Sequence, residues 1–282
     1  MPVTDGELTS LASSHDIISL GMLADDARRR RHGSRTTFVR VADVSAEPGA
    51  PTSWPAGAGE VRIVGVPATV AAAVTRVEEV SAVRGVPVSG FSLADLEELA
   101  ARETITVRAL LERLHAAGLE LVAEAPFDRL LDPRRSIEEV NIAGLRLARL
   151  TIRQSATADA AALLKEVVAL QHAVGVIRAF APLPRTLNPA APTTGYEDVK
   201  RVALARLCVD NISSIQVDWS LYGPKLAQVA LTVGADDVDG VSPVDESGEG
   251  RRRAPLEEIR RSIRAANLEP VERNGRFEPL SR

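Results

Sequence analysis

A group of polar side chains late in the sequence has the residue types needed to bind or activate a small molecule. The group lies between a tryptophan and an acidic stretch, GADDVDG at 234–240, and comprises Trp219, Lys225, Gln228, Asp236 and Asp237, with Asp239 following. A lysine and a carboxylate close together can act as acid and base, or can hold a polar ligand. Acidic clusters are also typical of solvated turns, so a surface turn and a ligand pocket both stay open.

The position of Lys225 bears on the choice between a surface turn and a ligand pocket. It follows Gly223 by two residues, at the start of a segment with helical spacing, where the positive end of the helix dipole disfavours a cation. We therefore expect a compensating partner for Lys225, either Asp237, Asp236 or an anionic ligand. The alternative is a lysine side chain that simply points into solvent.

Other chemistry-bearing residues give little support for a metal or a cofactor. The single cysteine, Cys208, lies among apolar helical residues and is interpreted as a core residue; the four histidines do not form metal-binding pairs. There is no glycine-rich dinucleotide fingerprint, no P-loop and no G-x-S-x-G stretch. We expect no metal and no cofactor.

The composition argues against nucleic acid and membranes as binding partners. The net charge of -4 gives no general attraction to nucleic acid or to acidic membranes, and the 3% of aromatic residues provides few base-stacking platforms. The arginine run at 28–35 is interpreted as the end of a helix. No apolar run is long enough to span a membrane, and the N-terminal residues lack a signal pattern. These features predict no nucleic acid, no membrane and a cytoplasmic location.

The elements that must position these residues alternate along the chain. Strand-like segments at 37–41, 60–66, 86–91, 119–125 and 176–183 are separated by helical segments, including two between 92 and 118 with Thr104 as the second cap and one opened by a capping box of Ser136 and Glu139. Strands that alternate with helices indicate a parallel sheet. Without a dinucleotide fingerprint, a barrel is favoured over a doubly wound sheet.

The predicted fold class is α/β, an incomplete TIM-type (β/α) barrel of parallel strands with a C-terminal α/β extension. We expect a single domain over 1–282, consisting of an N-terminal helix and strand (1–45), a linker (46–59), a partial barrel (60–184) and a C-terminal region (185–282). The barrel is expected to be open because the 41–59 connection is short and the 151–160 segment is compressed. An open barrel would leave a sheet edge for another element or subunit to cover.

Two long stretches resemble a known family. The stretch DIISLGMLADDARRRRHGSRTTFVR is similar to the N-terminal segment of the radical S-adenosylmethionine enzymes of the futalosine route to menaquinone, namely aminofutalosine synthase and cyclic dehypoxanthine futalosine synthase. The stretch at 203–240 resembles their C-terminal signature. The matching residues there are Asp210, Asn211, Trp219, Gly223, Lys225, Gln228, Ala230, Leu231, Gly234, Ala235 and Asp237.

The resemblance also shows what has changed. After the segment corresponding to FVR, the family carries a C-x-x-x-C-x-x-C loop whose thiolates hold a four-iron, four-sulfur cluster, but here 46–59 contains no cysteine and Cys208 alone cannot replace three ligands. The family's glycine-rich approach to S-adenosylmethionine is replaced by AEAPFDR at 123–129. We therefore expect a menaquinone-pathway relative without the cluster and without radical catalysis.

Two functions follow from this comparison. In the first, the chain is a pseudoenzyme that binds a nucleoside-like small molecule, or acts as an accessory partner of an intact paralogue or as a homo-oligomer. In the second, it is a menaquinone-pathway enzyme, an aminofutalosine synthase-like transferase that acts on a futalosine-type nucleoside with Lys225 and Asp237 as acid and base.

Overall fold

The computed structural model describes residues 5–83, 85–154, 160–186, 194–247 and 253–281. Its helices are α1 (Asp5–Ser13), α2 (Ile17–His32), α3 (Val70–Ser81), α4 (Leu93–Arg102), α5 (Val107–Ala116), α6 (Pro133–Ile142), α7 (Ala160–Val174), α8 (Gly195–Cys208), α9 (Trp219–Leu231) and α10 (Pro255–Ala265). Its strands are β1 (Arg35–Ser45), β2 (Glu60–Val64), β3 (Val88–Ser92), β4 (Leu121–Pro126), β5 (Arg146–Leu147), β6 (Leu150–Ile152), β7 (Ala179–Pro184), β8 (Ser214–Asp218), β9 (Asp237–Val241) and β10 (Glu269–Arg273). Within these ranges no helix is both long and apolar enough to cross a membrane.

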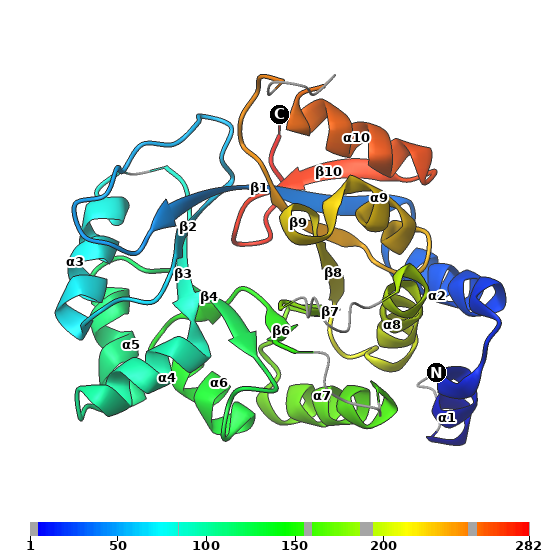
Figure 1. Ribbon diagram of the computed structural model, residues 1–282, viewed down its shortest axis with the longest axis horizontal. Helices are drawn as coiled ribbons and strands as arrows, with labels where there is room; N and C mark the ends of the chain where they lie inside the picture. Colours follow the sequence, from blue (N-terminus) through cyan, green and yellow to red (C-terminus); the bar gives the residue numbers. More distant parts are fainter. Residues whose placement is uncertain (1–4, 84, 155–159, 187–193, 248–252, 282) are drawn as a thin grey trace.

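The strands form a closed parallel barrel with the helices around its outside (Figure 1). Neighbouring strands follow the order β1-β2-β3-β4-β6-β7-β8-β9, and β9 then pairs with β1, with Thr37 opposite Asp237 and Phe38 opposite Val238. The predicted TIM-type α/β class is confirmed. The prediction that the barrel is incomplete is wrong, because the pairing of β9 with β1 closes the ring.

The compressed segment after residue 150 does not remove a strand from the barrel. β5 and β6 are only 2 and 3 residues long, and they pair with the beginning and the end of β4 respectively. Two short pieces therefore occupy the place of one strand, and β6 continues the sheet to β7. Residues 155–159 of the same segment lie outside the described residues.

The C-terminal region adds a further strand to the barrel wall, as the predicted extension requires. β1 is 11 residues long, enough for two neighbours along the same edge: β10 pairs with its first part, Arg35–Val39, and β2 with its last part, Val41–Ser45. The chain after β10 then turns beneath the barrel, where the N–H of Gly275 donates to the carbonyl of Gly59.

The apolar core lies largely between the barrel and its helices. α3 buries side chains at intervals of three and four residues, and α5 does the same, which is the stripe expected of a helix that covers a sheet. Each fully buried Val or Leu side chain contributes about 1.5–3 kcal/mol. Because the helices stabilise the barrel from outside, the inner face of the strands is available for polar groups.

Two helix starts differ from the sequence prediction. Thr106, not Thr104, caps α5 by accepting a backbone N–H, while Thr104 adopts a positive φ of 58° in the turn before it. α6 begins one turn earlier than expected, with Asp132 as its cap, so Ser136 and Glu139 lie within the helix and do not form a capping box.

The predicted linker 46–59 joins β1 to β2 without a helix, and an arginine of α3 holds it in place. Arg76 is fully buried. Its guanidinium donates at 2.7–3.1 Å to three backbone carbonyls, those of Ser45, Ala50 and Pro51. Glu79 pairs with Arg76 at 2.9 Å and accepts the N–H of Gly49 at 3.0 Å. The connection is thus anchored to α3 through its backbone.

Candidate functional site

The inner face of the barrel carries charged side chains where most barrels of this type carry branched aliphatic ones. Side chains alternate between the two faces of a strand, so Glu60 and Arg62 of β2 share one face, as do Asp237 and Asp239 of β9. All four are buried. A buried charge is tolerated only when it is paired and hydrogen-bonded, and each of these residues has partners inside the barrel.

Asp239 is the centre of this interior network. The guanidinium of Arg62 donates to both of its carboxylate oxygens, at 2.9 and 3.0 Å, and Arg149, between β5 and β6, also pairs with it. Arg62 also pairs with Glu60 at 2.7 Å. Burial raises the pKa of Asp239, but Arg149 and Arg62 outweigh burial and hold that pKa well below its ordinary value. Two acids and two arginines therefore balance one another.

A second set of charges bridges the C-terminal ends of the strands, the end where barrel active sites lie. Arg185, directly after β7, pairs with Asp218 at the end of β8 and with Glu124 of β4, the latter at 3.2 Å. Burial and the nearby Asp239 raise the pKa of Asp218, yet Arg185 and Arg149 bring it below its ordinary value. We call this end of the barrel, with Asp43, Glu124, Arg149, Arg185 and Asp218, the mouth.

Asp43 differs from the other acids of the mouth because its side chain is exposed. It is the register partner of Arg62 across β1 and β2, so both side chains lie on the inner face. Desolvation by the surrounding barrel wall raises the pKa of Asp43 even though Arg62 opposes that shift, and Asp239 adds to it. The mouth therefore presents one solvent-accessible carboxyl above a buried, paired network.

The opposite end of the barrel is covered by the residues that follow β10. Arg273 binds both oxygens of Asp237, at 2.6 and 2.7 Å. The ring of Phe277 lies under two guanidinium groups, 3.8 Å from Arg273 and 5.3 Å from Arg178. Arg276 pairs with Glu120, just before β4. Because this end is covered, the mouth is the end from which a ligand can approach.

In the structure, Asp236 and Asp237 of the predicted site both make contacts that join elements of the fold. Asp237 is fully buried and accepts hydrogen bonds from Arg273, Gln216 and Thr37, which uses both of its oxygens. Asp236, its neighbour, has a different set of partners on the helical side of the sheet, namely Arg206, His32, Ser214 and the N–H of Ile215. Both side chains cross-link elements of the fold.

The other three predicted residues lie on α9. The side chain of Lys225 is exposed, and neither Asp236 nor Asp237 pairs with it, so these two acids are not its partner. An anionic ligand in that role stays a prediction. The helix is broken just before it, where Gly223 takes a φ of 75°. Trp219 packs in the core as the first residue of α9, and Gln228 is half-buried. The described residues do not bring these five side chains into one pocket.

The mouth was not predicted from the sequence, although a signal was present. Arg62 stands in EVRIV and Arg149 in LARLTI, each a charged residue inside an otherwise strand-like apolar run. Such a residue must have a buried partner if the run is a strand. The identity of that partner depends on the closure of the barrel, which brings Asp239 beside both arginines.

The residues present do not fit the iron–sulfur cluster that the family resemblance implies. The connection 46–59 has no cysteine, and Cys208 lies on α8, where burial raises the pKa of its thiol to about 12. Thiolate is the form that binds iron. Across the described ranges, no three His, Cys, Asp or Glu side chains gather as a metal site.

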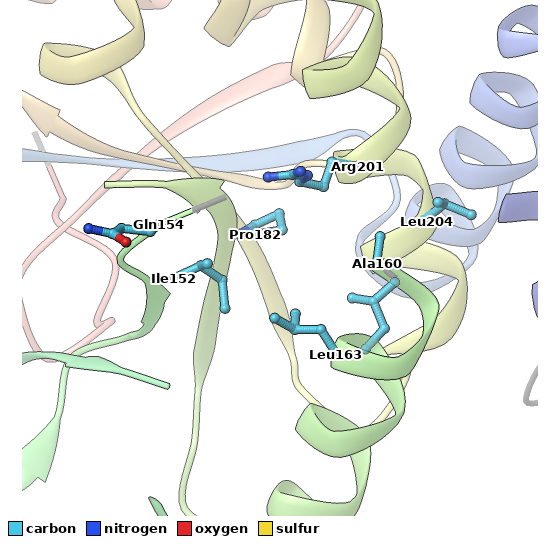
Figure 2. A pocket seen from close by; sticks show the side chains of 8 residues that line it. Ile152, Gln154, Ala160, Leu163, Pro182, Arg201 and Leu204 are labelled. Carbon is cyan, nitrogen blue, oxygen red and sulfur yellow. The ribbon is translucent and has the colours of Figure 1, made fainter. Parts of the chain in front are cut away.

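Other cavities lie outside the barrel. One lies between β6, β7, α7 and α8, with Leu163 and Leu204 in its lining and the polar ends of Gln154 and Arg201 to one side (Figure 2). Its volume of about 20 Å³ holds one water. Another is an open groove of about 710 Å³ between α4, α5 and α6, whose charged side chains include the ion pair Arg108–Glu139. Neither joins the mouth.

Comparison with known families supports the resemblance. The family described as CofH/MqnC C-terminal region matches residues 183–282. This match covers β8, α9, β9, α10 and β10. Those elements supply Asp218, Asp239 and the closing strand of the barrel.

Curated relatives extend the similarity to the rest of the chain. The chain is 27% identical over 214 residues to cyclic dehypoxanthine futalosine synthase of Streptomyces coelicolor, covering 66% of this chain and 53% of that protein. It is 38% identical over 94 residues to aminodeoxyfutalosine synthase of the same organism, covering 31% and 24%. The 5-amino-6-(D-ribitylamino)uracil–L-tyrosine 4-hydroxyphenyl transferase of Methanoculleus marisnigri is 30% identical over 184 residues, covering 56% and 50%. The chain spans about half, or less, of the length of these relatives.

Solved structures show the same fold. Methylornithine synthase (PylB) superposes with a TM-score of 0.70 at 16% identity, covering 96% of this chain and 95% of that chain. The hydrogenase maturase HydG superposes with a TM-score of 0.64 at 12% identity, covering 94% and 71%. These structures share the fold, and the sequence matches make the chain a relative of the radical S-adenosylmethionine enzymes of the futalosine route.

Proposed function

We propose that this chain is a cluster-free relative of the futalosine-pathway enzymes that binds a nucleoside-like small molecule at its barrel mouth and performs no radical chemistry. The observation that carries the proposal is the connection between β1 and β2. Where the resemblance implies three cysteine ligands, this chain has a cysteine-free segment whose backbone is fixed by Arg76. Cleavage of S-adenosylmethionine to a radical needs an electron from such a cluster.

The segment 123–129 supports the same conclusion. Where the family has bare glycine backbone, this chain has β4, whose Ala125 and Pro126 pair with β6. Glu124 extends a carboxylate to Arg185. Side chains therefore occupy a stretch that a glycine-rich loop would leave open to a close-packed cofactor.

The ability of the protein to assemble an iron–sulfur cluster gives the first test. The purified protein would be reconstituted anaerobically with ferrous iron and sulfide, beside the aminodeoxyfutalosine synthase of Thermus thermophilus, another relative, as positive control. We expect the control to become brown and this protein to stay colourless after desalting. Stoichiometric iron and sulfide, with a broad visible absorption, would refute the proposal.

Ligand binding gives the second test. Calorimetry with adenosine, an uncharged nucleoside, should give measurable heat for the natural protein and reduced heat for Asp218→Asn, which breaks the bridge to Arg185. Glu138→Gln serves as the matched control, because Glu138 is an exposed acid of α6, on the outside of the barrel. Equal heats for all three proteins would count against the mouth as the binding site.

The enzymatic alternative has less support from the geometry. Its proposed acid–base pair consists of an exposed lysine on α9 and a fully buried Asp237 whose oxygens are already bonded to Arg273, Gln216 and Thr37. The accessory role beside an intact paralogue stays a prediction from the sequence. Co-purification of this protein with such a paralogue would be the measurement for it.

A further inference from the structure

Asp43 has a combination of properties that no other acid of the mouth shares. It is exposed, it lies on the inner face beside its register partner Arg62, and it makes no hydrogen bond or ion pair with the residues that the structure describes. The neighbouring cations are already engaged. Arg62 is bound to Glu60 and Asp239, and Arg185 to Asp218 and Glu124.

The charges around Asp43 do not balance. The interior network and the mouth together hold five acids and three arginines, so the acids are in excess by two: Asp43, Glu60, Glu124, Asp218 and Asp239 against Arg62, Arg149 and Arg185. At a partly desolvated position, such an excess favours a ligand that brings positive charge. An anionic ligand would face repulsion at the same place.

A second observation concerns two buried polar atoms inside the barrel that have no hydrogen-bond partner among the described residues. Thr151 is fully buried, and its hydroxyl has no hydrogen-bond partner within the described structure. It follows Arg149 by two residues, so both side chains face inward, and the Nε of Arg149 is also without a partner. Buried polar atoms are rarely left unbonded, so these atoms indicate that water or a ligand enters the mouth.

One wall of the mouth is apolar. Val64 follows Arg62 by two residues on β2, which places it on the same inner face, one step nearer to the solvent. Val64 is 40% exposed, so its side chain is accessible to a ligand at this end of the barrel. Its register partner on β1 is Ser45, two residues after Asp43. A ligand that reaches Asp43 therefore also meets an apolar surface.

From this arrangement we propose that Asp43 binds the cationic head group of the ligand, a protonated amine or amidine on an apolar or aromatic body. The proposal rests on the proposed function, since it names the ligand class of the same site. Two N–H donors of an amidine can bond both oxygens of a carboxylate, and such charge-assisted bonds are about twice as strong as neutral ones. The apolar body would lie against Val64.

Three isosteric probes test this proposal: benzamidine, benzamide and benzoate, which are cationic, neutral and anionic with the same ring. Binding to the full chain is followed by ligand-observed NMR. We expect benzamidine to bind most tightly and benzoate least. In Asp43→Asn, the affinity for benzamidine should fall about 10-fold or more, as expected for the loss of one charge-assisted hydrogen-bonded pair. The control Glu138→Gln should bind benzamidine like the natural protein.

The pH dependence supplies an independent readout. The charged groups that face Asp43 are Arg62, Asp239, Arg149 and Asp218. The two acids among them have lowered pKa values and stay ionised, whereas the pKa of Asp43 is raised. Asp43 is therefore the first of the three acids to be protonated as pH falls, and benzamidine binding should weaken through its pKa. Asp43→Asn should abolish that pH dependence.

The outcomes separate the two proposals. Benzoate binding as tightly as benzamidine, or an unchanged affinity in Asp43→Asn, would overturn the role of Asp43. If adenosine still binds in an Asp218-dependent way, the proposed function stands without the role of Asp43. Failure of every probe at the mouth would overturn both.

Discussion

Replacing Asp239 by asparagine should destabilise the protein strongly, because among the described residues it is the acid that pairs with both Arg62 and Arg149 inside the barrel. The substitution preserves shape and leaves one acid, Glu60, to face two buried arginines. Removing one partner of a buried ion pair costs about 3–5 kcal/mol, since the remaining charge stays desolvated. For a domain whose total stability is about 5–15 kcal/mol, this is a large fraction.

Equilibrium denaturation in urea, followed by circular dichroism, measures this cost. A surface pair gives the matched control: Glu138→Gln breaks an ion pair of 2.9 Å to Arg134 whose side chains are 64% and 42% exposed. We expect the control to change the free energy of unfolding by less than about 1 kcal/mol. Because both variants replace an acid by its amide, the difference between their free energies of unfolding measures the effect of burial.

A double variant tests the charge balance itself. Arg149→Met in the Asp239→Asn background leaves Glu60 paired with Arg62 and restores a neutral interior. It should therefore recover part of the lost stability, although each single substitution is destabilising. A loss below about 1 kcal/mol for Asp239→Asn, or a double variant less stable than Asp239→Asn alone, would refute the account of the network.

Three further outcomes are expected. Arg76→Gln should release the backbone of the 46–59 connection from α3, so that limited proteolysis cleaves this connection faster, with little change in helix content. Cys208 should react with iodoacetamide about 1,000-fold more slowly than an unperturbed thiol, because its thiolate fraction is reduced by the shift in pKa from 9.0 to about 12. The pKa values of Asp239 and Asp218 are lower in the folded than in the unfolded protein. Their contribution to stability should therefore persist above a pH of about 4 and be lost as the pH falls below it. Measuring the free energy of unfolding as a function of pH would show this loss.

Most elements of the fold could be predicted from the sequence, because helical and strand periodicities alternate clearly along it. The closure of the barrel could not. The sequence shows the segment after residue 150 to be short, but not that β5 and β6 share the place of one strand. Likewise, the pairing of Thr37 with Asp237 joins residues 200 positions apart, and no local pattern specifies it.

For the same reason, only part of the candidate site could be predicted from the sequence. Asp236 and Asp237 are adjacent in sequence, which suggested one cluster, but neighbouring residues of a strand face opposite ways, and each has a separate set of partners. Asp43 gave no sequence signal, since an exposed aspartate at the end of a strand is ordinary. Its interest depends on Arg62 being beside it and already bound elsewhere.

The placement of β10 beside β1 has a consequence for how the chain folds. The first half of β1 pairs with β9 on one edge and with β10 on the other. During synthesis, both edges of that half stay without partners until more than 200 further residues have emerged. Such long-range parallel pairing slows folding and exposes a strand edge to intermolecular pairing. The barrel therefore cannot close until β9 has been synthesised and has reached β1.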